Sequence, residues 1–80
     1  MDVDSRVREV LAGVLEVPQS SIEDGFSRDG ASSWDSLAHL RLVSALEEAF
    51  GVRFTMQEVG DLTSFAAIRQ RLQASSPMLQ

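Results

Sequence analysis

Residues 35–51 read DSLAHLRLVSALEEAFG, and this stretch predicts a helix from Ser36 to Phe50. Gly51 suits the left-handed backbone position that commonly follows the last residue of a helix. At about 100° per residue, one side of this helix is apolar and should face the core. That side holds Leu42, Val43, Leu46 and Phe50.

The opposite side of the same helix is a mixed strip that we interpret as a partner surface. Its polar members should stay in water, while Leu37 and the neighbouring Leu40 add apolar area of the kind that marks interaction sites. The residues expected to contact partner proteins are Leu37, Leu40, Arg41, Ser44, Glu47 and Glu48. Two plainer interpretations remain open: peripheral core packing for the two leucines, and a solvated face for the two glutamates.

The residues ahead of this stretch predict an N-terminal helix over residues 3–15. Asp2 or Asp4 is its candidate N-cap, and Pro18 should end it, because the residue before a proline avoids helical backbone angles. Its apolar face, with three- and four-residue steps, holds Val3, Val7, Val10, Leu11, Val14 and Leu15.

Residues 17–34 combine serines, glycines and acids without a sustained period, and predict one long loop. A single helical turn is expected at residues 20–23, where the spacing matches a capping box. Ile22 and Phe26 should hold the loop against the core, with Trp34 as a packing anchor at its end.

The remainder of the chain predicts two more helices. The Thr55 to Glu58 spacing matches a capping box, so a short helix should begin there and break at Gly60. A last helix over residues 64–74 should bury Phe65, Ile68 and Leu72 and expose Arg69, Gln70 and Gln73. The fold class is thus all-α: a four-helix bundle with a long first loop and a short third helix. We expect one domain over residues 1–74 and a disordered tail over residues 75–80.

The composition is that of a small acidic domain. Twelve acidic residues against seven arginines give a net charge of −5, a sign that would repel a nucleic-acid backbone. No apolar run is long enough to span a bilayer, so we expect no nucleic-acid and no membrane partner. The absence of cysteine excludes disulfides and favours a reducing compartment. We expect a cytoplasmic monomer.

Ser36 is the candidate functional residue. Unpaired backbone N–H groups and the positive end of a helix favour an anion at this position, so a phosphodiester attached to the serine oxygen would suit the local field. The plainer interpretation is a serine kept for capping, a role that Asp35 can also fill. We interpret Ser36 as a tether point, with Asp35 and Leu37 beside it.

Asp35, Ser36 and His39 also suggest a catalytic triad, but the helical geometry argues against one. The imidazole would have to contact a serine and a carboxylate that both precede it by one turn on the same side. His39 lies nearer the apolar side, so we expect it to pack at the rim of the core. A lone histidine with scattered carboxylates also lacks a compact metal-ligand spacing. The sequence predicts neither a catalytic residue nor a metal site.

Several features together resemble the acyl carrier protein family. They are Asp35-Ser36-Leu37 at the start of a helix, LEEAFGV at residues 46–52 and the spacing of the last two helices. The resemblance spans residues 7–72. It implies that Ser36 receives 4′-phosphopantetheine from coenzyme A through a phosphopantetheinyl transferase, and that the thiol of this arm carries acyl groups as thioesters. The chain itself would then need no catalytic group.

Within that family, WDSLAHL at residues 34–40 looks more like the discrete carriers of polyketide or related natural-product pathways. The resemblance implies acyl-loading enzymes and acyl-transfer or ketosynthase-type enzymes as further partners. Arg41 interrupts the acidic character usual for this helix, and we hypothesise that it selects among partners. A peptidyl carrier, a fatty-acid synthase carrier and an unmodified helical interaction domain remain alternatives, and a small hydrolase has the least support.

Overall fold

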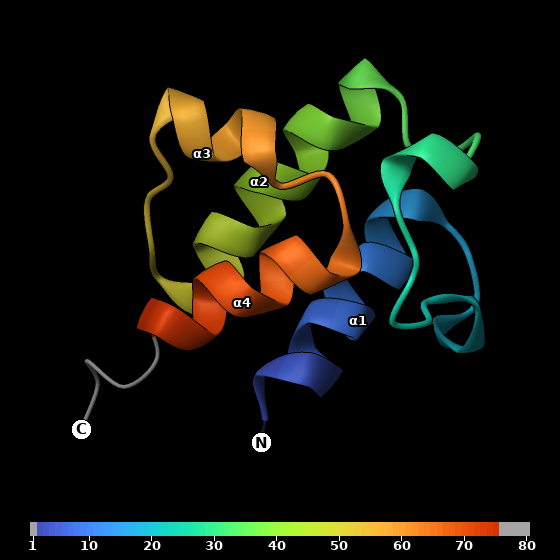
Figure 1. Cartoon of the computed structure of the whole chain (residues 1–80), viewed down its shortest axis with the longest axis horizontal. Helices are drawn as coiled ribbons and strands as arrows, with labels where there is room; N and C mark the ends of the chain where they lie inside the picture. The colour runs from blue at the N-terminus through green and yellow to red at the C-terminus, as the bar shows by residue number, and fades with distance from the viewer. Residues whose placement is uncertain (1, 76–80) are drawn as a thin grey trace.

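The structure is a computed structural model that describes residues 2–75. Its α-helices, labelled in Figure 1, are α1 (Val3–Leu15), α2 (Ser36–Phe50), α3 (Met56–Asp61) and α4 (Phe65–Ser75). The prediction of an all-α bundle with a short third helix and a long first loop is confirmed. The predicted tail lies outside the described residues from residue 76 onward. Ser75, which we assigned to that tail, is instead the last residue of α4.

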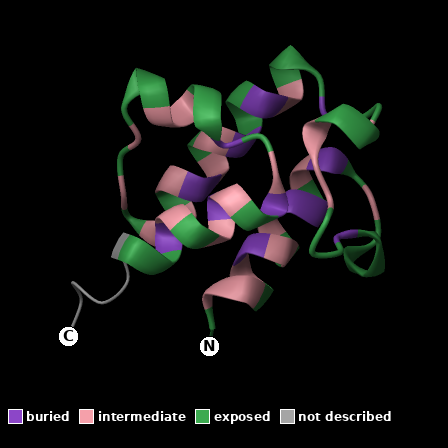
Figure 2. Cartoon of the chain, in the orientation of Figure 1, coloured by how far each residue is buried: buried purple, intermediate pink, exposed green. Residues whose placement is uncertain are grey.

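The core lies where α1 faces α2 and α4. Figure 2 shows the buried positions gathered on the facing sides of these helices. The buried apolar residues are Val7, Leu11, Ala12, Leu15, Ile22, Trp34, Leu42, Leu46, Leu62, Phe65, Ile68 and Leu72. The apolar faces predicted for α2 and α4 are therefore confirmed, with Val43 and Phe50 half-buried at the margin of the α2 face.

The ends of α1 illustrate how local chemistry fixes a helix. The Asp2 carboxylate accepts a hydrogen bond from the Ser5 N–H at 2.9 Å, which confirms Asp2 as the N-cap. The helix ends at Leu15 because Glu16 adopts the left-handed conformation, with φ at 58°. The predicted bounds, residues 3–15, are confirmed, but Pro18 is not what ends the helix, since the backbone leaves the helix at Glu16 before the proline is reached.

The loop between α1 and α2 contains two short 3₁₀ turns, η1 (Gln19–Ser21) and η2 (Arg28–Gly30). The predicted turn is present as η1, but it has no side-chain cap, so the predicted capping box is not formed. The second turn was not predicted. Ile22 is buried and Phe26 is half-buried against the core, which confirms that these two residues hold the loop.

Backbone hydrogen bonds also tie this loop to residues 63–65, at the start of α4. The Arg28 N–H donates to the Thr63 carbonyl at 2.9 Å, and the Phe65 N–H donates to the Phe26 carbonyl at 2.9 Å. Between these bonds, Ser27 and Ser64 form an isolated antiparallel bridge. Sequence periodicity gave no sign of this pairing, because a single bridge has no repeating pattern. Its consequence is that Arg28 has a fixed position in the fold.

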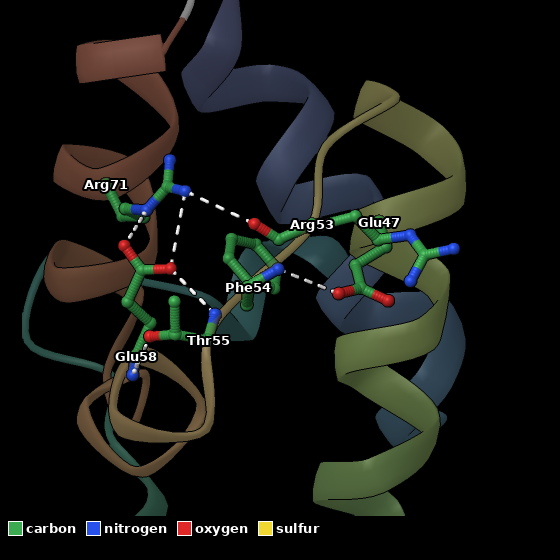
Figure 3. A network of polar contacts seen from close by, with 6 residues as sticks. All are labelled: Glu47, Arg53, Phe54, Thr55, Glu58 and Arg71. Atoms are coloured by element: carbon green, nitrogen blue, oxygen red, sulfur yellow. Dashed lines mark hydrogen bonds and ion pairs between the residues drawn. The ribbon is translucent and has the colours of Figure 1, made fainter.

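The short helix α3 depends on its cap and on a contact to α4. Thr55 and Glu58 form the predicted capping box, with the Glu58 N–H on Thr55 Oγ1 at 3.1 Å and the Thr55 N–H on Glu58 Oε1 at 2.9 Å. Arg71 of α4 forms a hydrogen-bonded ion pair with the Glu58 carboxylate, with its Nε 2.7 Å from Oε2 (Figure 3). Gly60 was expected to break this helix but lies within it, and the helix ends at Asp61.

Arg69 also differs from its prediction. We expected an exposed side chain, as found for Gln70 and Gln73, but Arg69 is half-buried. Its Nη1 lies 3.3 Å from Asp4 Oδ2, and its guanidinium lies over the Phe65 ring. An ion pair between α1 and α4 therefore covers one edge of the core.

Glu58→Gln tests the α3–α4 contact through the pH dependence of stability. Hydrogen bonds from Arg71, and then from the Thr55 N–H, lower the pKa of Glu58 below its ordinary value of 4.5. The unfolded chain therefore binds this proton more readily. The stabilisation is fully present above about pH 4.5 and is lost as the pH falls through the folded-state pKa. We expect the free energy of unfolding in urea to fall more steeply with acid in the wild type than in Glu58→Gln.

Glu23→Gln is the matched control, because it also removes one carboxylate, from an exposed position in the first loop. It should keep the wild-type dependence on pH. Equal acid dependence in the wild type and in Glu58→Gln would contradict the role assigned to the Arg71 contact.

Candidate functional site

Ser36 occupies the first helical position of α2. Asp35 is the N-cap, and its Oδ1 accepts a hydrogen bond from the Ala38 N–H at 2.9 Å. The capping role is thus filled by Asp35, and the Ser36 side chain is exposed. A hydroxyl at this position stands beside the unpaired N–H groups and the positive end of the helix dipole.

Arg28 reaches this hydroxyl from the first loop. Its Nη2 donates to Ser36 Oγ at 3.3 Å, and its Nε donates to the Trp34 carbonyl at 3.2 Å. Sequence analysis missed this residue, because η2 and its pairing with the segment before α4 place it beside Ser36 from eight positions away. The only signal was an arginine in a half of the chain with eight acids and three arginines.

His39 connects three parts of the structure behind the hydroxyl. The Trp34 Nε1–H donates to His39 Nδ1 at 3.0 Å, and His39 Nε2 lies 2.8 Å from the Val59 carbonyl of α3. An indole N–H can only donate and a carbonyl can only accept, so the ring is the neutral tautomer with its proton on Nε2. His39 is 6 % exposed and Trp34 is 2 % exposed. The predictions of a packed histidine and a packing tryptophan are confirmed.

These contacts leave no catalytic triad. Both ring nitrogens of His39 have partners other than Ser36, and the Asp35 carboxylate caps the helix. Among residues 2–75, no group of three or more histidine, cysteine or acidic side chains is arranged to hold a metal ion. The site is therefore an exposed Ser36 hydroxyl at the start of a helix that buried residues hold in place, with the Arg28 guanidinium beside it.

Comparison with known proteins agrees with this geometry. Residues 5–72 match the family described as phosphopantetheine attachment site. The chain belongs to this family. Its members are carrier domains that bind 4′-phosphopantetheine as a prosthetic group, are generally not catalysts, and interact with phosphopantetheinyl transferases and biosynthetic enzymes.

The residues at the start of α2 fit the group that this carrier domain binds. The group is joined through a phosphodiester, which carries a negative charge and needs an accessible oxygen. Ser36 supplies an exposed oxygen, the end of α2 supplies backbone N–H groups and a positive field, and Arg28 supplies a guanidinium. When bound, the group supplies a flexible arm with a thiol.

The strip predicted as the partner surface of the carrier domain is mostly exposed. Leu37 is 58 % exposed and Leu40 is 62 % exposed, and Arg41, Ser44 and Glu48 are exposed as well. Met56 at the start of α3 is 91 % exposed and was not singled out from the sequence, because an isolated methionine carries no pattern. Peripheral core packing therefore does not account for either leucine.

Glu47 differs from the rest of this strip. It is half-buried, and its Oε2 accepts a hydrogen bond from the Phe54 N–H at 2.8 Å, as Figure 3 shows. The carboxylate thereby holds the turn between α2 and α3. In the same figure, Arg71 reaches the Arg53 carbonyl at 3.5 Å from the other side of the turn. No described helix of the carrier domain is both long and apolar enough for a membrane span.

His39→Phe tests the connection behind Ser36. The substitution keeps an aromatic ring but leaves the Trp34 N–H and the Val59 carbonyl without their partner. Leaving a buried polar group without a partner costs about 1–3 kcal/mol, so we expect a loss of that size in the free energy of unfolding in urea.

A second background separates this hydrogen bond from general packing. In Trp34→Phe the indole N–H is absent, so adding His39→Phe should cost less than it does in the wild type. The same cost in both backgrounds would show that the Trp34–His39 hydrogen bond contributes nothing.

Proposed function

We propose that Ser36 is the attachment residue for 4′-phosphopantetheine. We further propose that the chain carries acyl intermediates as thioesters in polyketide or related secondary-metabolite biosynthesis. The observation that carries the first proposal is the exposed Ser36 hydroxyl at the start of α2, with Asp35 as the cap and Arg28 at the oxygen. Asp35 and Leu37 flank the attachment point, and we propose that the transferase recognises them together with Ser36.

The attachment is a transfer of one phosphoryl-linked group. Ser36 Oγ forms a bond to the coenzyme A phosphorus that is nearer the pantetheine. The bond from that phosphorus to the oxygen bridging the two phosphates breaks, and adenosine 3′,5′-bisphosphate leaves. The hydroxyl proton passes to a base of the transferase, since the only histidine of this chain is engaged elsewhere. In this proposal the chain is a substrate and a carrier, with no catalytic residue of its own.

The pathway type is proposed from the sequence around the attachment residue. WDSLAHL at residues 34–40 and the arginine at position 41 depart from the strongly acidic second helix of many fatty-acid carriers. A fatty-acid synthase carrier and a peptidyl carrier are the alternatives. We propose a cytoplasmic monomer, for which the cysteine-free sequence and the small apolar area outside the core are the support.

The proposed partner surface runs along the outer side of α2. Leu37 and Leu40 supply apolar contact near Ser36, and Arg41, Ser44, Glu47 and Glu48 supply polar contact further along. A surface of this size suits partners that dock briefly and release, and its charges should govern the rate and the choice of partner more than the affinity. Glu47 has a second role at the α2–α3 turn, so its substitution is a poor probe of docking.

The attachment is tested by intact-mass measurement. After incubation with coenzyme A and a broadly active phosphopantetheinyl transferase, the wild type should gain the mass of one phosphopantetheine group. Ser36→Ala should gain nothing. Ser33→Ala is the matched control, because it removes an exposed serine hydroxyl three residues away and should load as the wild type does. A folded wild type that gains no mass would leave an unmodified interaction domain as the better account.

Arg41→Glu tests partner selection. Reversing this exposed charge should change the ratio of kcat/KM values between two partner enzymes by about tenfold or less, because a rim charge acts mainly on association. Arg53→Glu makes the same charge change beyond the other end of α2 and should leave the ratio unchanged. Identical ratios in all three proteins would refute a role for Arg41 in selection.

A further inference from the structure

Backbone contacts alone fix the position of Arg28 in the fold. Its N–H is bonded to the Thr63 carbonyl, and the adjoining Ser27 pairs with Ser64, so the residue is held against the start of α4. Its Nε then donates to the carbonyl of Trp34, whose own side chain is buried and bonded to His39. The guanidinium is thus aimed at Ser36 by contacts that do not involve Ser36.

The Arg28 guanidinium has more hydrogen-bond donors than the two contacts described above use. It carries five N–H groups in a fixed planar arrangement. Two of them are directed at the Trp34 carbonyl and at Ser36 Oγ. A neutral hydroxyl oxygen accepts one such bond, whereas a phosphate group adds charge attraction and can accept two parallel N–H bonds from the same guanidinium.

The charge of Arg28 is not neutralised within the described chain. Arg6, Arg69 and Arg71 each lie within ion-pair distance of a carboxylate, while no carboxylate among residues 2–75 does so for Arg28. Asp29, which directly follows Arg28, is not within ion-pair distance of it, and Asp35, beside Ser36, directs Oδ1 to the Ala38 N–H.

A cation at this place works against the field of the helix. The N-terminus of α2 carries the positive end of the helix dipole, so an arginine beside Ser36 is an unfavourable neighbour for it until an anion arrives. An attached phosphodiester would satisfy both the helix end and the guanidinium. Arg28 is half-buried, points at Ser36 Oγ and has no ion-pair partner among the described residues. An anion attached to this oxygen would supply that partner.

We propose that Arg28 holds the phosphodiester of the loaded protein and thereby joins the arm to the first loop. The proposal rests on attachment at Ser36. Through Arg28, a charge added on α2 becomes bonded to residues 26–28, which are in turn bonded to residues 63–65 at the start of α4. Loading should therefore stiffen the first loop and set the direction in which the arm leaves the protein. Arg28 is a positioning residue here and takes no part in acyl chemistry.

The first test compares thermal stability before and after loading, with intact mass confirming the state of each sample. The wild type should melt about 2–6 °C higher when loaded, as one partly exposed charge pair would give in a domain of this size. Arg28→Gln should lose that increment, and Arg28→Lys should recover part of it. Arg53→Gln, the same charge loss at an exposed arginine remote from Ser36 in sequence, should keep it. High salt should shrink the wild-type increment.

The second test needs no variant, so it can still show whether Arg28 binds the phosphodiester if Arg28→Gln is not loaded. Hydrogen exchange of the Arg28 guanidinium protons, followed by NMR, should slow on loading, while that of Arg53 stays the same. If the wild type loads, an unchanged Arg28 exchange rate, or an equal melting increment in Arg28→Gln, overturns the Arg28 proposal and leaves attachment at Ser36 intact. If the wild type gains no mass at all, the attachment itself has failed.

Discussion

A neutral imidazole between an indole N–H and a backbone carbonyl is the contact on which the functional end of the molecule depends. His39 joins the last residues of the first loop, through Trp34, to α3, through Val59, while it sits in the first turns of α2. The first loop, α2 and α3 thereby meet at one ring. The ring stacks beside Trp34, which in turn stacks on Phe26 at 5.9 Å between centroids. Trp34 and His39 are buried, so the start of α2 is packed against the core although the Ser36 hydroxyl itself is in water.

Function in this carrier domain follows from a separation of tasks among neighbouring residues. Asp35 caps α2, so the Ser36 hydroxyl is not needed as the helix cap. Both ring nitrogens of His39 are hydrogen-bonded to other groups, so this ring is not placed to act as a base for Ser36. Among residues 2–75, no imidazole or carboxylate is hydrogen-bonded to the Ser36 hydroxyl. In the proposed function this is no obstacle, because the transferase supplies the base that activates the hydroxyl and other enzymes unload the arm. Arg28 adds a positive charge where the proposed product carries a negative one.

Much of this could be read from the sequence, for physical reasons that differ between elements. The bounds of α2 were predicted to the residue, because Asp35 and Gly51 are strong end signals and the apolar period between them is long. The burial of His39 followed from the same period. The end of α1 was predicted at the right residue but assigned to Pro18, because a glutamate in the left-handed conformation is rare and has no sequence signature. Arg28 was missed because a single bridge brings it to Ser36, and Glu47 was read as surface because its partner is a backbone N–H in the next turn. The attachment role of Ser36 stays a prediction.

The hydrogen bond from Phe54 to Glu47 lies at the opposite end of α2 from the hydroxyl. Fourteen residue steps at about 1.5 Å each separate Ser36 from Phe50, so the two ends of this helix are some 21 Å apart. Contacts that fasten the α2–α3 turn can therefore be exchanged between homologous scaffolds while the chemistry at the opposite end is left alone. For chimera construction, the replaceable piece is therefore the turn itself, because a junction at Gly51 that replaced everything after it would also replace the segments bonded to His39 and Arg28 beside Ser36.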